Sequence, residues 1–404
     1  MSVRYAARNL QRHRGRTLLT LAAIALGVAA LTVAGGFVHD IYAQLAEAVI
    51  HSQSGHLQVG KAGIFGAGSR SPEKHLIDDG GAIEAAAAAI PGVKASMSRV
   101  GASGLLSTGR REAPVMLEGV EPAEEAPLST GLTFLTGRNL NGADRMAVIV
   151  GEGVADLLAL RPGSAVTVLA PTIDGAMNTL ELDVVGVFRS FSKEYDARTI
   201  KVPIAAAKDL LATPSVMKIV VLLDRTSDTS AIAARLAGVA AQRGLVVKDW
   251  VQLNDFYQGT VELYDRQFGV LNLIILVMVV LGVSNSVNMS VLERLGEFGT
   301  LQAIGLRKSD IVRLIMAENV LLGFVGAAAG AVVGIGVALA ISAYGIPMPP
   351  PPNSNAGYTA TIRIVPAVVA TAVAVGFIAT LIAGMMPAWR VARTPIVEAL
   401  RENV

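Results

Sequence analysis

The sequence contains no cysteine, which excludes disulfide bridges, thiolate metal sites and cysteine nucleophiles. Charged residues are scarce, at 16% of the chain, whereas soluble domains carry about 25%. The small net charge of +2, without a basic patch interleaved with aromatic residues, argues against nucleic acid as a partner. Hydrophobic residues make up 52% of the chain and the mean hydropathy is +0.53. The composition therefore indicates a membrane protein with a soluble part.

Sequence signatures of nucleotide binding and hydrolysis are also missing. There is no G-x-x-x-x-G-K-[ST] loop, no H-E-x-x-H pair and no G-x-S-x-G elbow. His51 and His56 flank a serine-rich stretch, but their spacing is not that of a metal site. We expect both to be surface or hydrogen-bonded histidines. We predict no catalytic residue, no metal site and no cofactor site in this chain.

Four apolar runs are each long enough to cross a bilayer, which takes about 20 residues in a helix. They cover residues 17–38, 268–289, 320–341 and 364–386. The first run exceeds the apolar region of a signal peptide and no A-x-A site follows it, so we expect an uncleaved anchor.

Two features of these runs predict contacts between helices. Asn272 and the polar stretch 284–288 should face another helix or a cavity. Gly326, Gly330 and Gly334 permit close helix approach, either within one subunit or between two.

A block of residues between the first and second runs, 39–267, has no membrane-length apolar run and is large enough for a core of its own. Its alternating and turn-bounded patterns predict a mixed α/β domain. The predicted strands are His56–Gly60, Val115–Val120, Met146–Val150, Ala165–Ala170, Leu180–Phe188, Thr199–Pro203, Met217–Leu223 and Leu245–Val251. The predicted helices are Ala82–Ile90, Val154–Leu160, Ile204–Leu211 and Ser230–Gln242. The fold class is thus a membrane α-helical protein of four transmembrane helices, with a mixed α/β extracytoplasmic domain inserted between the first two.

Three connecting segments have distinct patterns. The strands around Asp174-Gly175, a turn dipeptide, should pair as a hairpin. Residues 254–267 have no proline and should form a stalk helix continuous with the second span. Residues 342–363 are rich in proline and should form an extended outer loop.

Basic residues indicate which ends of the spans face the cytoplasm. Residues 1–16 carry five arginines and no acidic residue, in a pattern that predicts an amphipathic helix on the membrane. Further basic residues lie in the loop 290–319 and in the tail 387–404, whereas the loop 342–363 has only Arg363. We expect both termini in the cytoplasm and residues 39–267 outside it.

The segment Val291–Glu318 is the most distinctive part of the chain. Leu295, Phe298, Leu301 and Gly305 recur at helical spacing, with the charged residues elsewhere around the helix. Gly305 fits a helix stop, and Ser309-Asp310 fits the N-cap and acidic first turn of a new helix. The predicted structure is a short amphipathic helix, a break and a second helix. We also expect Glu318, at the edge of the third span, to contact this elbow.

This segment resembles the signature of FtsX/MacB/LolC-type ABC transporter permeases, E-R-x-x-E-[IF]-G-x-L-[RK]-A-[LIM]-G-A followed by an Ile and a Glu. Gln302 and Leu306 depart from the pattern. In that family the element is a coupling helix that docks on a separate ATPase subunit, which binds ATP and magnesium. The resemblance implies an ATPase-coupling role for Glu293, Arg294, Glu297, Phe298, Gly299, Leu301, Ala303, Gly305 and Glu318.

Other parts of the chain are similar to the same family. The tail from Pro387 to Arg401 resembles P-A-x-x-A-[AS]-R-x-x-P-x-E-A-L-R, and Arg8 to Thr20 resembles the family's N-terminus. In the soluble block, Ile90-Pro91-Gly92-Val93 and Glu194-Tyr195-Asp196 resemble the family's extracytoplasmic core domain. The resemblance implies an ABC ATPase partner, contact with membrane lipid, and a second permease copy or a paralogue.

Three functions are compatible with this resemblance. The chain is expected to transmit ATP-driven motion to its extracytoplasmic domain and so extract or export a lipoprotein or lipid-linked substrate. The alternatives are efflux of small molecules or peptides with a periplasmic adaptor, and regulation of cell-wall hydrolases without transport. The size of the soluble block argues against the third. The connection at 170–180 is short for a hook that grips a periplasmic carrier.

Overall fold

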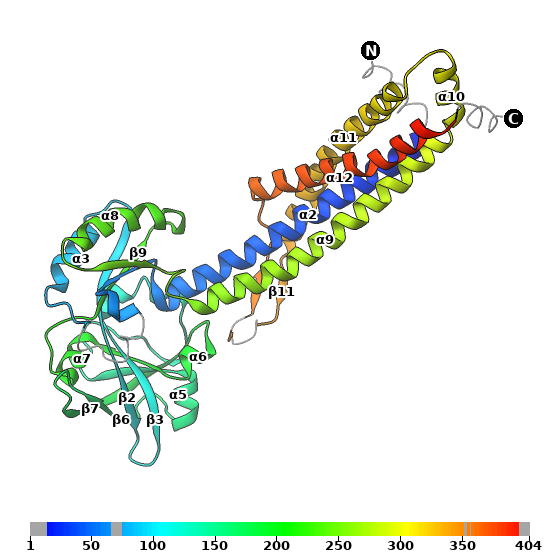
Figure 1. Cartoon of the computed structure of the whole chain (residues 1–404). Helices are drawn as coiled ribbons and strands as arrows, with labels where there is room; N and C mark the ends of the chain where they lie inside the picture. Colours follow the sequence, from blue (N-terminus) through cyan, green and yellow to red (C-terminus); the bar gives the residue numbers. More distant parts are fainter. Residues whose placement is uncertain (1–13, 66–74, 351–353, 356, 396–404) are drawn as a thin grey trace. The chain divides into compact units, whose positions relative to one another are not determined.

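The computed structural model describes residues 14–65, 75–350, 354–355 and 357–395. The described residues form two compact units (Figure 1). One, the span unit, takes in the chain up to Tyr42, residues 260–347 and the chain from Thr359. The other, the sheet unit, takes in residues 43–259 and 348–358. Most of the predicted basic helix at 1–16 lies outside the described residues.

Four long helices confirm the four predicted spans. They are α2 (Arg14–Val49), α9 (Asp255–Leu292), α11 (Lys308–Tyr344) and α12 (Pro366–Arg393). Helix α9 is unbroken, which confirms the predicted continuity of stalk and second span. Helix α12 begins with Pro366 in its first turn, where the missing N–H of proline costs nothing. A short helix, α10 (Leu295–Ala303), lies between α9 and α11, and the short strands β11 (Ile346–Met348) and β12 (Tyr358–Ala360) pair between α11 and α12.

The glycines of α11 bring it against α2 within one subunit. A Cβ atom on Gly330 would lie 2.7 Å from the carbonyl oxygen of Ala25, and one on Gly334 would lie 3.0 Å from the Cα of Ala29. Gly326 meets Ile24 in the same way. Of the two possibilities that the G-x-x-x-G spacing left open, the structure has packing within one chain.

Helices α2 and α9 run side by side in Figure 1 and share polar contacts. The hydroxyls of Thr20 and Ser286 are hydrogen-bonded to each other. Tyr42 donates a hydrogen bond to Asp265 Oδ1 at 2.6 Å. Ser286 therefore faces a neighbouring helix, as its position in an apolar run predicted.

The sheet unit is a mixed α/β domain, which confirms the predicted class. Its strands are β1 (Leu57–Gly60), β2 (Val93–Ser107), β3 (Glu112–Val120), β4 (Thr133–Gly137), β5 (Ala147–Gly151), β6 (Ala165–Pro171), β7 (Met177–Arg189), β8 (Thr199–Pro203), β9 (Lys218–Leu223) and β10 (Val246–Asp249). Its helices are α3 (Gly80–Ala88), α4 (Pro122–Glu125), α5 (Glu152–Leu158), α6 (Lys193–Asp196), α7 (Ile204–Leu211) and α8 (Thr229–Ala241), and a π-helical turn, Ile50–Ser54, ends α2. All eight strands and four helices that the sequence predicted are present.

Strand β2 belongs to two parts of the sheet. Its first half pairs with β9, which continues to β1 and β10. Its second half closes a ring of pairings that runs through β3, β8, β5, β7 and β6 and returns to β2. The predicted hairpin of β6 and β7 forms, with Gly175 at a φ of 83° in its turn.

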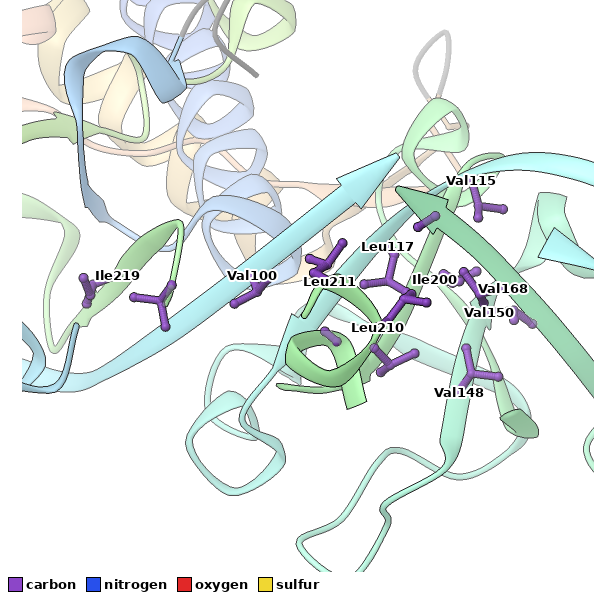
Figure 2. Close-up of a cluster of buried hydrophobic side chains, with 14 of the residues drawn as sticks. Val100, Val115, Leu117, Val148, Val150, Val168, Ile200, Leu210, Leu211 and Ile219 are labelled. Carbon is purple, nitrogen blue, oxygen red and sulfur yellow. The ribbon is translucent and has the colours of Figure 1, made fainter. Parts of the chain in front are cut away.

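The main hydrophobic cluster of the sheet unit takes in residues of these ring strands and continues to β9, where Ile219 belongs to it (Figure 2). Alternate residues of the strands point inward, among them Leu117 of β3, Val150 of β5 and Ile200 of β8. Leu210 and Leu211 of α7 complete the cluster. The hydrophobic effect thus holds together strands that are far apart in sequence.

Besides the short pair β11 and β12, two described strands of the sheet were not predicted, and one of them, β2, has 15 residues. Strand β2 contains Ser96, Ser98, Gly101 and Gly104, residues that are depleted in strands. Its conformation is fixed by pairing with β9, β3 and β6. Strand β4 is short and its residues are mostly exposed, so it lacks a clear alternation.

The outer side of the ring buries charged side chains. Arg99 and Lys201, each 1% exposed, both contact Glu125 Oε1, at 2.5 and 2.9 Å. Glu118 lies 3.7 Å from Arg99 and accepts a hydrogen bond from Tyr195 at 2.8 Å. Burial opposes ionisation of Glu118, but Arg99 and Lys201 outweigh it and lower the pKa of this carboxyl. Each of these charged side chains thus lies next to a group of opposite charge.

His56 is buried and hydrogen-bonded, as expected of a histidine without metal-site spacing. Its Nδ1 accepts the Leu223 N–H at 3.1 Å, so Nε2 carries the proton and faces Thr226 Oγ1 at 3.0 Å. Burial, partly offset by Glu47, lowers the pKa of His56 from 6.5 to about 4. The neutral ring is part of the folded structure.

We predict that Gly330→Ala destabilises the span unit. The added methyl group would lie 2.7 Å from a backbone oxygen that cannot move independently, and such overpacking costs about 1–3 kcal/mol. The measurement is thermal unfolding of the purified protein in detergent. Gly336→Ala is the matched control, because that glycine of the same helix has open space around it. Equal melting temperatures for the two variants would contradict the packing described.

We predict that the sheet unit loses stability as the pH falls from about 6.5 towards 4. In this window the unfolded state binds a proton on His56 that the folded state excludes. The expected loss is about 2 kcal/mol at pH 5. Denaturation followed by Trp250 fluorescence in a Trp389→Phe background measures it. His56→Asn, whose amide oxygen can still accept the Leu223 N–H, should make the free energy of unfolding less dependent on pH in this window. An unchanged pH dependence in this variant would refute the assignment to His56.

Candidate functional site

The predicted coupling segment forms a tight elbow. Only Glu293 and Arg294 separate the end of α9 from the start of α10. Helix α10 ends at Ala303, and Gly305 follows at a φ of 106°, a backbone conformation that glycine adopts at little cost. The predicted order of helix, glycine break and helix is confirmed.

The second helix of the elbow begins earlier than predicted. Helix α11 starts at Lys308 with Arg307 as its N-cap, so the prediction of an N-cap at Ser309-Asp310 was wrong. Asp310 does lie in the acidic first turn and accepts the Arg307 N–H at 3.2 Å. A carboxylate at this third position can satisfy the same free N–H that a cap would.

Arg294 links α10 to α11 by ion pairs. The guanidinium is 7% exposed and lies 2.9 Å from Glu318 of α11 and 3.3 Å from Glu297 of α10. It also covers the ring of Phe298, at 4.9 Å from the ring centroid. The expected contact of Glu318 with the elbow is confirmed. The sequence placed Arg294 away from the apolar positions of the helix, and the structure buries it there with its planar fork held by two carboxylates and a ring.

The apolar face of α10 is covered by its own chain. Leu295 and Phe298 are buried in the cluster that includes Ile311 and Ile315 of α11 and Val391 of α12. Gln302 is 9% exposed, and Gly299 is also buried. These side chains position the helix.

The outward surface of the elbow consists of a charged edge and an apolar tip. Glu293 and Glu297 are exposed, as is Ala303. Ile304 is 75% exposed and Leu306 39%, with Gly305 between them. Ile304 and Leu306 were not among the residues predicted to couple to the ATPase. The sequence feature that could have identified them is the helix-ending Gly305. Residues that flank such a glycine lie beyond the helix and cannot join its buried face.

A cavity of about 710 Å³ lies in the span unit, between α2, α9 and α12. Most of its lining is apolar, and its polar groups are His39, Asp265, Asn272 and Thr371. Asn272 thus faces a cavity, one of the two settings expected for it. The remaining lining residues are Leu31, Ala34, Gly35, Val38, Phe268, Gly269, Leu273, Leu276, Ala367, Val368, Ala372 and Val375.

Two family models match the chain, in sequence order. The MacB-like periplasmic core domain matches residues 17–239, and the FtsX-like permease C-terminal model matches residues 269–396. The chain belongs to the FtsX/MacB/LolC family of ABC transporter permeases. It is a multi-pass inner-membrane protein, and permeases of this type work with ABC ATPase partners.

Several curated proteins are similar to this permease. The lipoprotein-releasing system transmembrane protein LolC of Neisseria meningitidis is 25% identical over 79% of this chain and 76% of its own. LolC of Xylella fastidiosa, strain Temecula1, is 25% identical over 73% of this chain and 75% of its own. The macrolide export ATP-binding/permease protein MacB of Sodalis glossinidius is 26% identical over 82% of this chain but 52% of its own.

Among solved structures, the periplasmic region of MacB from Actinobacillus actinomycetemcomitans is similar. The match has a TM-score of 0.37 and 15% identity, and it covers 53% of this chain and 95% of that one.

We predict that Glu318→Ala loosens α10. The substitution leaves Glu297 as the carboxylate that the structure places beside the buried Arg294 guanidinium. Removing one partner of a buried ion pair should cost about 3–5 kcal/mol. Hydrogen exchange of the amides of residues 295–303 measures the effect. Arg313→Ala is the control, because its pair with Asp310 is exposed and 3.7 Å long. Equal exchange in both variants would contradict this role of Arg294.

Proposed function

We propose that this permease transmits the ATP-driven motion of a separate ATPase subunit to its sheet unit, and so extracts or exports a lipoprotein or another lipid-linked substrate. The observation that carries the proposal is the elbow. It presents an exposed apolar tip at Ile304 and Leu306, and behind that tip the Arg294–Glu318 pair connects it to α11. A push on the tip would therefore move a span. The chain itself needs no catalytic residue, since the ATPase binds ATP and magnesium.

The proposed orientation follows from charge. Arg307, Lys308, Arg313, Arg390 and Arg393 all lie at the end of the spans that carries the elbow. Positive residues favour the cytoplasmic side. The elbow and both termini are therefore proposed to be cytoplasmic and the sheet unit periplasmic.

The cargo class is supported by the cavity and by the relatives. The cavity is lined mainly by aliphatic and small side chains and lies at the end of the spans remote from the elbow. An acyl chain would bury its surface there at about 0.8 kcal/mol per CH₂ group. The LolC proteins of Neisseria and Xylella are named as parts of lipoprotein-releasing systems. A homodimer, or a heterodimer with a paralogue, is proposed to carry out the extraction.

Efflux of small molecules with a periplasmic adaptor is the second candidate. The match to MacB of Sodalis glossinidius, a macrolide export protein by name, favours it. The same cavity could hold an apolar small molecule. The two candidate functions differ in the cargo whose transport should be lost when a substitution fills the cavity.

We predict that Ile304→Asp/Leu306→Asp removes the ATPase from the purified protein. Two carboxylates would have to be desolvated on docking, so the copurified ATPase should fall at least about tenfold. The measurement is copurification in detergent, followed by the rate of ATP hydrolysis. Leu157→Asp in the sheet unit, at a residue 57% exposed, is the control and should retain the ATPase. Retention by the double variant would mean that the elbow does not dock the ATPase.

We predict that Gly269→Trp blocks cargo release without loss of the ATPase. Gly269 lines the cavity, and a side chain added there meets open space. The indole would occupy the volume proposed for an acyl chain. Release of a lipoprotein from proteoliposomes is the readout, with Gly336→Trp on an exposed face of α11 as the control. Undiminished lipoprotein release would refute cargo binding in this cavity.

A further inference from the structure

The connection between the third and fourth spans is divided between the two units. Residues 348–358 belong to the sheet unit, whereas the chain on both sides of them belongs to the span unit. Two described residues of this connection, Ser354 and Asn355, contact the sheet unit, and we call them the strap. The chain therefore joins the two units through α2, through α9 and through the connection that contains the strap.

The strap is held by backbone and side-chain contacts. Ser354 is 1% exposed and is the antiparallel bridge partner of Ser192. The Asn355 N–H donates to Phe191 O at 3.0 Å. The Asn355 side-chain amide donates to Asp196 Oδ2 at 2.5 Å. A segment with both its backbone and its side chain engaged is docked in a defined register.

Asp196 is a buried acceptor for the strap. Its carboxylate is 1% exposed and accepts the Ser190 N–H on both oxygens, at 3.0 and 2.9 Å. Burial raises the pKa of Asp196, although the hydrogen bonds from Ser190 and Asn355 oppose this. A buried carboxylate that loses a donor is strongly destabilised, so the strap amide is not readily replaced.

The Asp196 site is connected to the end of α2. Tyr195, its neighbour on α6, donates to Glu118, which is part of the buried ion network with Arg99. Arg99 also donates to the carbonyl oxygen of Gln53, in the π-helical turn that ends α2, at 2.8 Å. A chain of polar contacts, all within the sheet unit, thus runs from the end of α2 to the strap.

On the N-terminal side of the strap, the chain leads through α11 to the elbow. Helix α11 is unbroken over 37 residues, from Lys308 beside the elbow to Tyr344 before the strap, a length of about 55 Å. Arg294 binds this helix at Glu318. A displacement of α10 would therefore move α11. The chain after the C-terminal end of α11 leads to the strap, which is docked on the sheet unit.

We propose that the strap is a permanent attachment through which α11 moves the sheet unit, a mechanical input separate from α2 and α9. The inference rests on the proposed function, because it needs an ATPase to move the elbow. The interaction surface is the β-bridge and carboxylate site formed by residues 190–196, and its occupant is residues 354–355 of the same chain. The strap stays docked throughout the cycle and does not open as a gate.

Docking is tested by a disulfide in the full-length protein, which has no native cysteine. Cα atoms of antiparallel partners lie about 4.5–5.5 Å apart, within the span of a disulfide. Ser192→Cys/Ser354→Cys should therefore form an intramolecular bond in membranes under mild oxidation, and at equal rates with and without ATP and vanadate. The single-cysteine variants are the controls. Absence of the bond, or its loss with ATP and vanadate, would overturn the proposal.

Transmission is tested in the complex with the ABC ATPase that copurifies from membranes. The readout is the change in hydrogen exchange of the sheet unit on adding ATP and vanadate. Asn355→Ala should reduce this change at least about twofold while ATPase binding and hydrolysis persist, and Asn355→Asp should do the same. Oxidised Ser192→Cys/Ser354→Cys in the Asn355→Ala background should restore the change, and dithiothreitol should abolish the rescue.

The outcomes separate the two proposals. A wild-type complex that hydrolyses ATP without any change in the sheet unit would refute the proposed function, and the strap's role with it. A wild-type response that Asn355→Ala and Asn355→Asp leave intact would refute the strap alone. A loss that the disulfide fails to rescue would show a folding defect in the variant and would also overturn the strap's mechanical role.

Discussion

The burial of the Arg294 guanidinium is the constraint on which the coupling segment depends. A charge with 7% exposure is tolerable only if opposite charges and hydrogen bonds replace water. Glu318, Glu297 and the ring of Phe298 supply them from two helices. Because the guanidinium needs all of these groups at once, α10 has one position against α11. Lysine could not make the same forked contact.

The sheet unit uses the same device at the end of another helix. Arg99 is buried between Glu125 and the carbonyl of Gln53, where α2 ends in a π-helical turn. Buried ion pairs of this kind contribute little net stability, because desolvation offsets their attraction. Their effect is geometric, since a displaced helix end would leave an unpaired charge. In both units a buried arginine thus lies beside the end of a long helix.

Local patterns in the sequence predicted much of the fold. The four spans, the continuous α9, the hairpin of β6 and β7 and the contact of Glu318 all follow from apolar periodicity, turn residues or charge. Strand β2 was missed because its serines and glycines carry no strand signal and its pairing partners are far away in sequence. The burial of Arg294 was not predicted because helical spacing does not reveal which face the rest of the chain covers.

The β6–β7 hairpin gives this fold room to acquire new recognition elements. The ring of strands is complete before the turn is reached, and Asp174, Gly175 and Ala176 are exposed. Ile173, just before them, is anchored by a hydrogen bond to Leu211 O at the end of α7. Doubling the length of such a turn costs only about 0.6 kcal/mol in closure entropy. Insertions at this tip are therefore tolerated at low cost, while the core and the membrane helices keep their sequence.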